Sequence, residues 1–171
     1  MAELSLKARL QPSLLDRLTD HQPESSHETR EDRVVTELQL REHLRRDLSA
    51  LLNTTHMAAI LDLTAFPELR RSVLNYGIPD LAGKTLSSVD PKVLERHLRE
   101  AILNYEPRLL KRSLKLRVLS HQTATGHNGI VFDIEAELWA QPIPIALYLR
   151  TEIDLEDGSV RVDEVSETGA R

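Results

Sequence analysis

The sequence predicts an α+β fold, in which N-terminal helices pack on one face of a C-terminal antiparallel four-stranded meander. Two observations carry this prediction. Apolar residues recur at helical spacing up to Tyr105, and beyond Arg108 the apolar period changes to two. Between the two halves stands the triplet Glu106, Pro107 and Arg108, whose proline disfavours helical geometry at the residue before it. The triplet therefore marks the boundary between the helical half and the strand half.

A long helix is predicted over residues 31–52, ending at Asn53. Its expected apolar face consists of Val34, Leu38, Leu40, Leu44, Leu48, Leu51 and Leu52. The other side offers two favourable i, i+4 ion pairs, which join Glu37 to Arg41 and Glu42 to Arg46.

Two further helices are predicted before the triplet. A short one opens at Pro67 and runs to Leu74, with Leu69, Val73 and Tyr76 directed inward and Gly77 in the left-handed closing position. Asp90 and Pro91 mark the start of a longer helix that ends at Tyr105. The expected inner face of this longer helix consists of Leu94, Leu98, Ala101, Ile102 and Tyr105.

Four strands are predicted after the triplet, over residues 114–118, 130–139, 143–153 and 160–162. A polar loop containing His121 and His127 joins the first two, and Asp157-Gly158 signals the last hairpin. In the first hairpin, Lys115 and Arg117 are expected to face the acidic residues Asp133, Glu135 and Glu137. The first and last strands are edges, and an exposed edge can accept a strand from another chain.

One domain over residues 31–165 accounts for these elements. Residues 1–30 are expected to be a mobile N-terminal segment, with a short docking turn at 13–18 that carries Leu14, Leu15 and Leu18. Residues 166–171 are expected to be a frayed tail.

Composition excludes several classes of protein. The net charge of −5 argues against nucleic-acid binding, and the absence of cysteine excludes disulfides and thiolate metal sites. A local basic cluster lacks the interleaved aromatic residues of a nucleic-acid surface and fits a protein interface or a solvated face; it consists of Arg108, Lys111, Arg112, Lys115 and Arg117. No apolar run is long enough to cross a bilayer and no signal peptide is recognised, so a cytoplasmic protein without membrane insertion is expected.

Motifs for catalysis, cofactors and metals are missing from the sequence. The seven histidines form no His-Glu-x-x-His pattern, and neither a nucleophile elbow nor a phosphate-binding glycine loop occurs. A glycosidase would need one carboxyl group that stays protonated opposite a second carboxylate. Glu106 is the one carboxylate in a distinctive context, and Arg108 beside it favours the ionised form. No enzyme activity, cofactor or metal is therefore expected.

Five stretches together resemble the family of contractile-tail baseplate wedge proteins, which includes the TssE-type subunits of bacterial type VI secretion systems. They are Ser-Leu-Leu-Asp-Arg-Leu at 13–18, Asp-Leu through Leu-Leu-Asn-Thr at 47–54, Ser-Val-Leu-Asn-Tyr-Gly-Ile-Pro-Asp-Leu at 72–81, Glu-Pro-Arg at 106–108 and Phe-Asp-Ile-Glu-Ala at 132–136. Their order along the chain is that of the family. The resemblance also implies a connecting loop over residues 56–66, where the apolar period does not persist.

The resemblance implies a structural role in a contractile injection machine. It implies contacts with other baseplate wedge subunits of the TssF, TssG and TssK type, and a sheet over residues 114–165 on which the contractile sheath starts to assemble. Glu106, Pro107 and Arg108 are implied to contact the core bundle of the wedge. Recruitment from the cytoplasm to the inner-membrane-anchored secretion apparatus follows from the same likeness. The alternative is a soluble regulatory binding module, because an anti-adaptor of the stress response has the same fold.

Overall fold

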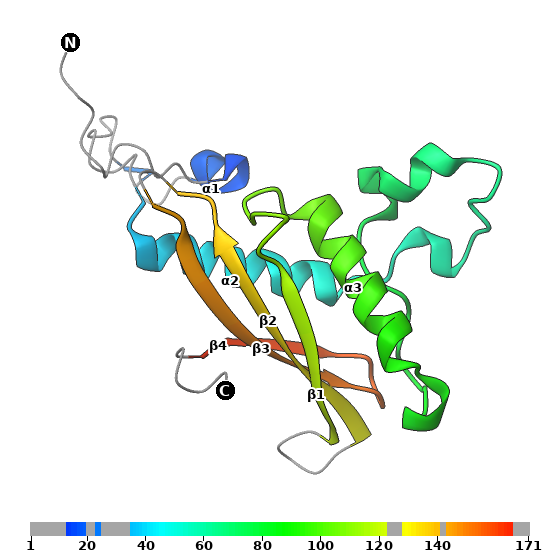
Figure 1. The fold of residues 1–171 in the computed structure, drawn as a ribbon. Helices are drawn as coiled ribbons and strands as arrows, with labels where there is room; N and C mark the ends of the chain where they lie inside the picture. The colour runs from blue at the N-terminus through cyan, green and yellow to red at the C-terminus, as the bar shows by residue number, and fades with distance from the viewer. Residues whose placement is uncertain (1–12, 20–22, 25–34, 123–127, 141–142, 166–171) are drawn as a thin grey trace.

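A computed structural model describes residues 13–19, 23–24, 35–122, 128–140 and 143–165. The helices are α1 (Leu14–Leu18), α2 (Glu37–Leu52) and α3 (Pro91–Tyr105), with short 3₁₀ helices η2 (Met57–Ala59), η3 (Pro67–Arg71), η4 (Val73–Asn75) and η5 (Leu86–Ser88). The strands are β1 (Lys115–Gln122), β2 (Asn128–Leu138), β3 (Ile145–Asp154) and β4 (Val160–Glu164). They form one antiparallel sheet in chain order, which confirms the predicted α+β class and meander (Figure 1). Predictions for residues 1–12, 166–171, Val34 and His127 lie outside the described residues.

Helix α2 begins at Glu37, six residues later than predicted, because Thr36 caps it. The Thr36 side chain accepts a hydrogen bond from Gln39 N, and the Gln39 side chain accepts one from Thr36 N at 2.8 Å. This reciprocal capping box satisfies two backbone donors that a helix start leaves open. Residues 35 and 36 are accordingly not helical.

The buried face of α2 is narrower than predicted and consists of Leu40, Leu44, Leu48, Leu51 and Leu52. Leu38 was wrongly placed in the core and is 78% exposed. At 3.6 residues per turn it lies roughly 110° around the helix from the centre of the buried face. The predicted pair of Arg41 with Glu37 is present at 2.8 Å.

The second predicted ion pair of α2 is wrong in its partner. Glu42 pairs with Arg45 at 2.6 Å instead of with Arg46. The Arg46 guanidinium is drawn toward two aspartates, Asp16 and Asp47, which the spacing rule for a single helix does not take into account.

The segment between α2 and α3 contains 3₁₀ turns and no α-helix. The single helix predicted over residues 67–74 is wrong: the extended backbone of Ser72 separates η3 from η4. Val73, predicted to point inward, is 80% exposed, whereas Tyr76 packs against the core. Gly77 does adopt a positive φ of 121°, and a Cβ there would lie 2.2 Å from the carbonyl oxygen of Thr54.

Helix α3 has the predicted bounds. Asp90 caps it by accepting hydrogen bonds from the backbone N–H groups of Lys92 and Val93, and Glu106 ends it. Its buried residues are Leu94, Leu98, Ala101 and Ile102, as the sequence predicts, with Tyr105 partly buried.

The core lies between the sheet and the two long helices. Helix α2 crosses one face of the sheet, and α3 lies along β1 (Figure 1). Alternate strand residues fill this face, and Phe132, Ile134 and Leu149 are each about 1% exposed. The strand register pairs Lys115 with Glu135 and Arg117 with Asp133, as predicted, although the side chain of Asp133 is bound by Arg150 of β3. Strand β1 runs to Gln122, so His121, predicted in a loop, belongs to the strand.

Candidate protein-interaction site

Glu106 and Arg108 form an intramolecular ion pair where α3 gives way to the strand half. Arg108 Nε donates to Glu106 Oε1 at 2.7 Å, and Nη2 donates to Glu106 Oε2 at 2.5 Å. The backbone N–H of Arg108 also donates to Oε1 at 3.1 Å. Pro107 holds the two residues in a tight turn, so the guanidinium meets the carboxylate through two parallel bonds. The Glu106 side chain is only 5% exposed and that of Arg108 20%.

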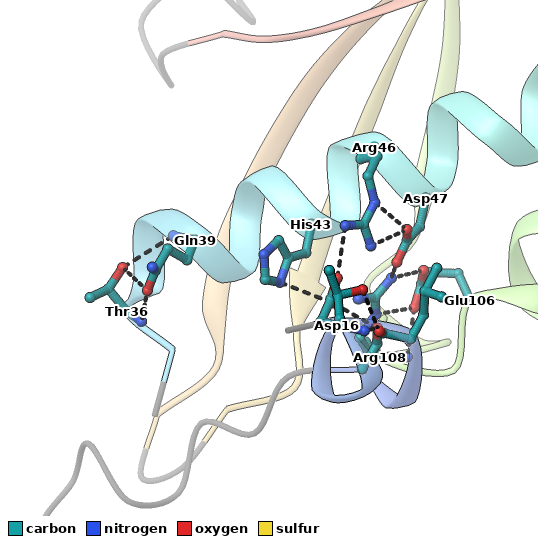
Figure 2. Close-up of polar contacts among 11 residues, drawn as sticks. Asp16, Thr36, Gln39, His43, Arg46, Asp47, Glu106 and Arg108 are labelled. Carbon is teal, nitrogen blue, oxygen red and sulfur yellow. Dashed lines mark hydrogen bonds and ion pairs between the residues drawn. The ribbon is translucent and has the colours of Figure 1, made fainter. Parts of the chain in front are cut away.

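The ion pair is the end of a chain of alternating charges that crosses α2 (Figure 2). Arg108 Nη2 also donates to Asp47 Oδ2 at 2.7 Å, and the other oxygen of Asp47 accepts from Arg46 at 2.7 Å. Arg46 Nη1 lies 2.7 Å from Asp16 Oδ1, and His43 Nδ1 lies 3.0 Å from Asp16 Oδ2. A single chain of ion pairs thus connects α1, α2 and the turn after α3.

The electrostatics of this chain favour the ionised forms. Burial by itself would lower the pKa of Arg108, but the hydrogen bonds and charges of Glu106 and Asp47 raise that pKa above its ordinary value. Burial would likewise raise the pKa of Asp16, and hydrogen bonds from Arg46 and Ser13 together with the charges of His43 and Arg46 outweigh it and lower that pKa. Arg108 and Asp16 are therefore each held in the charged state that the neighbouring groups of opposite charge favour.

Helix α1 is attached through this polar contact, and its leucines face solvent. Asp16 is 6% exposed, while Leu14, Leu15 and Leu18 are 71%, 64% and 75% exposed. Ser13 helps to form α1, because its side chain accepts from Asp16 N and donates to Asp16 Oδ2. The buried carboxylate of Asp16 therefore anchors α1 in an orientation that leaves its three leucines facing solvent.

A cleft of about 410 Å³ opens beside the triplet. Its walls come from α1, α2, the segment before α3 and the triplet itself: Ser13, Leu14, Asp47, Leu51, Tyr76, Tyr105, Glu106, Pro107 and Arg108. Tyr76 and Tyr105 pack edge to face with ring centroids 5.2 Å apart. The Tyr105 hydroxyl donates toward the carbonyls of Ser72 and Asn75 at 2.9 and 2.8 Å, which fixes the aromatic wall. The cleft therefore combines a charged floor, a rigid aromatic wall and the exposed ring of Pro107.

The sequence placed Glu106, Pro107 and Arg108 at one point but did not reveal what they contact. Asp47, Arg46 and Asp16 were missed as members of the site. A signal was present for Asp47, a carboxylate directly before the buried Leu48 on a helix with an apolar face. Asp16 sits between apolar positions of a short turn, and sequence spacing could not place that turn against α2.

Within the described residues, histidines and carboxylates form no group of three or more that is suited to a metal ion. None of the helices described there is both long and apolar enough to cross a bilayer.

Comparison with known proteins places the chain in a family. The model of the family described as baseplate wedge protein gp25 matches residues 38–143, which is more than half of the chain. The chain belongs to this family. It is the family of the TssE-type subunits, so the likeness drawn from the short motifs is confirmed. Searches of curated proteins and of solved structures gave no significant match.

Membership in the gp25 family gives the protein a structural role in a phage-tail-like baseplate and implies contacts with other baseplate proteins. The matched segment runs from α2 to beyond β2 and contains Asp47 and the whole triplet. Helix α1 lies outside the matched segment, as do β3 and β4.

Proposed function

We propose that this protein is a structural subunit of a type VI secretion baseplate, where it links wedge subunits and offers a platform for assembly of the contractile sheath. One observation carries the proposal: in a member of the baseplate wedge family, the Glu-Pro-Arg triplet borders a cleft whose shape is fixed by buried ion pairs. A preorganised surface loses less conformational entropy on binding, so such a cleft suits a permanent protein contact.

The ion pairs serve this interface by positioning its surface. Glu106 is almost completely buried, and both of its carboxylate oxygens accept hydrogen bonds from Arg108. A partner in the cleft would therefore contact Pro107 and the aromatic wall and not the carboxylate. The Arg108 side chain is more accessible, at 20% exposure, although its Nη1 atom is buried and has no acceptor among the described residues. We therefore assign Pro107 and the cleft walls to direct contact, and assign Glu106 to holding the turn.

Subunits of the TssF, TssG and TssK type are the proposed wedge partners, and the sheath protein is the proposed partner of the sheet. The protein acts in this scheme in the cytoplasm, at the inner-membrane-anchored apparatus. No catalytic step is part of the proposed role, in keeping with a family of structural baseplate proteins.

Co-purification with the wedge subunits tests the proposal. Glu106→Ala and Arg108→Ala are each expected to reduce the recovered complex, provided that circular dichroism shows a folded variant. Because both changes also affect stability, Leu14→Asp provides a second test: this cleft-wall side chain is 71% exposed, so its replacement leaves the core unchanged. Leu38→Asp is the matched control, an equally exposed leucine outside the cleft.

The expected result is loss of the complex with Leu14→Asp and full recovery with Leu38→Asp. Recovery that is equal for the cleft variants and the control would remove the cleft from the interface. No complex with the wild-type protein would overturn the baseplate assignment itself.

A further inference from the structure

The one tryptophan of the chain, Trp139, stands directly after β2 with its side chain in solvent. It is 54% exposed, and Ile143, two residues before β3, is 73% exposed. Its neighbours Leu138 and Ala140 are both buried. Because successive residues of an extended chain point to opposite sides, the ring of Trp139 is turned away from the core.

The backbone of Trp139 is held against the Glu-Pro-Arg triplet, where the turn after α3 runs beside the end of β2 (Figure 1). Trp139 N donates to Arg108 O at 2.7 Å. An isolated antiparallel β-bridge pairs Leu109 with Leu138. In that register Arg108 lies directly opposite Trp139. Arg108 is also a wall of the cleft, so the exposed tryptophan adjoins the cleft at this residue.

Two unpaired cations lie on the turn beside this strand end. Glu137 N donates to Ser113 Oγ at 2.8 Å, which holds the turn against the residues that lead to Trp139. Lys111 and Arg112 on the same turn are exposed and have no ion-pair partner among the described residues. The single carboxylate of Glu137 offsets one of the two charges, so the surroundings of the ring are basic.

The indole of Trp139 also retains a free donor. Its N–H has no acceptor within the part of the chain that the structure describes. A tryptophan that becomes buried usually finds a hydrogen-bond partner for this group. A carboxylate on a partner would satisfy the indole donor and would also attract Lys111 and Arg112.

An exposed aromatic ring on a fixed backbone has the properties of an interface anchor. Tryptophan is among the residues that dominate binding hot spots, and its burial removes about 150–250 Å² from water. Since the backbone of Trp139 is already ordered, binding restricts little more than the torsions of its side chain. The cleft is concave and accepts a group of the partner, whereas Trp139 projects and needs a pocket.

We infer that Trp139 anchors a second contact with the wedge subunit that binds the cleft, by entering an apolar pocket of that subunit with an acidic rim. Continuity identifies the occupant, because Arg108 belongs to the cleft and lies opposite Trp139. The basic turn at Lys111 and Arg112 identifies the charge of the rim. The inference rests on the proposed function, in which the cleft binds a wedge subunit.

The affinity of the full chain for purified wedge subunits of the TssF and TssG type tests the anchor. We expect Trp139→Ala to weaken binding at least about tenfold, because a hot-spot side chain is lost. Phe66→Ala is the matched control, since Phe66 is an aromatic residue of similar exposure, 60%, outside the cleft. Both side chains are exposed, so thermal unfolding should show equally stable variants.

A matched pair of charge reversals tests the acidic rim. Lys111→Glu combined with Arg112→Glu is expected to weaken binding about tenfold through repulsion of like charges. Arg70→Glu combined with Arg71→Glu makes the same charge change at two exposed positions of η3 and is expected to leave the affinity unchanged. Equal affinities of the two double variants would overturn the acidic rim.

The remaining outcomes separate the anchor from the function on which it rests. Wedge subunits that bind Trp139→Ala as tightly as the wild-type chain, or that lose equal affinity with Phe66→Ala, would overturn the anchor and leave the wedge role standing. Wedge subunits that do not bind the wild-type chain would overturn the proposed function and, with it, the inference.

Photo-cross-linking locates the pocket directly. Benzoylphenylalanine in place of Trp139 is expected to cross-link to a wedge subunit, at a peptide that contains apolar residues beside aspartate or glutamate. The same group in place of Phe66 is expected to give no cross-link. Cross-links from position 66 alone, or from position 139 to a basic peptide, would contradict the inference.

Discussion

Removal of Arg108 tests how much the buried end of the ion-pair chain contributes to stability. In Arg108→Ala, the Glu106 carboxylate, which is 5% exposed in the wild-type protein, loses both guanidinium bonds. Asp47 loses one bond but keeps its contact with Arg46 at 2.7 Å. The main cost is therefore the unpaired charge of Glu106.

The size of this cost follows from burial. Breaking a fully buried pair by removing one partner costs about 3–5 kcal/mol. Because the Arg108 side chain is 20% exposed, water can enter the space that it leaves. We therefore expect Arg108→Ala to lower the free energy of unfolding by about 2–3 kcal/mol. Glu106→Gln keeps the shape of the side chain and one acceptor oxygen, so we expect it to lower the free energy of unfolding by about 1–2 kcal/mol.

Urea unfolding of the two single variants and the double variant measures the coupling between the residues. We expect the double variant to be more stable than the sum of the single changes predicts, with a coupling energy of about 1–2 kcal/mol. Lys115→Ala is the control, because the Lys115–Glu135 pair has side chains 63% and 41% exposed and should contribute less than about 1 kcal/mol. Additive effects for Glu106 and Arg108 would refute the reasoning.

Two more predictions concern the ends of α2 and its neighbours. Gly77→Ala should destabilise the fold by about 3 kcal/mol or more in thermal or urea unfolding, since its Cβ meets Thr54 O at 2.2 Å, whereas Gly83→Ala, with open space and φ of 70°, should cost about 1 kcal/mol. Similar costs at both positions would contradict this account. The attachment of α1 should be complete above the ordinary carboxyl pKa of 3.8 and be lost as pH falls through the lower pKa of docked Asp16. Hydrogen exchange in α1 should then accelerate, and Asp16→Asn should accelerate it at neutral pH; exchange that is indifferent to both changes would contradict the attachment of α1 through Asp16.

Local signals sufficed for much of the fold. Asp90, Pro91 and Pro107 fix the ends of α3 through capping and proline sterics, and the strict period of two in β2 identifies a half-buried strand. Both depend on neighbouring residues alone. The first hairpin places Lys115 and Arg117 opposite two of the three acidic residues that charge complementarity predicted, Glu135 and Asp133.

Errors arose where tertiary contacts decide. Leu38 fits an apolar pattern, but the packing of α2 turns it away from the sheet. The misplaced start of α2 is different, because the capping box between Thr36 and Gln39 is a local signal that the apolar pattern does not take into account. Arg46 pairs with Asp16 instead of Glu42 because α1 packs beside α2. The spacing of residues within α2 does not reveal this contact. The partners of Arg108 in the candidate site were not predicted for the same reason, since Asp47 and Arg108 are 61 residues apart in the sequence.

Chemical protection of position 107 tests most directly whether the cleft beside the triplet is a wedge interface. The chain has no cysteine, so Pro107→Cys places a single thiol at an exposed position on the cleft wall. Glu68→Cys, exposed on η3 and outside the cleft, is the control. With wedge subunits bound, the maleimide reaction of the cleft thiol should slow at least about tenfold while the control reacts as before. A bound complex in which both thiols react at their free rates would contradict the account.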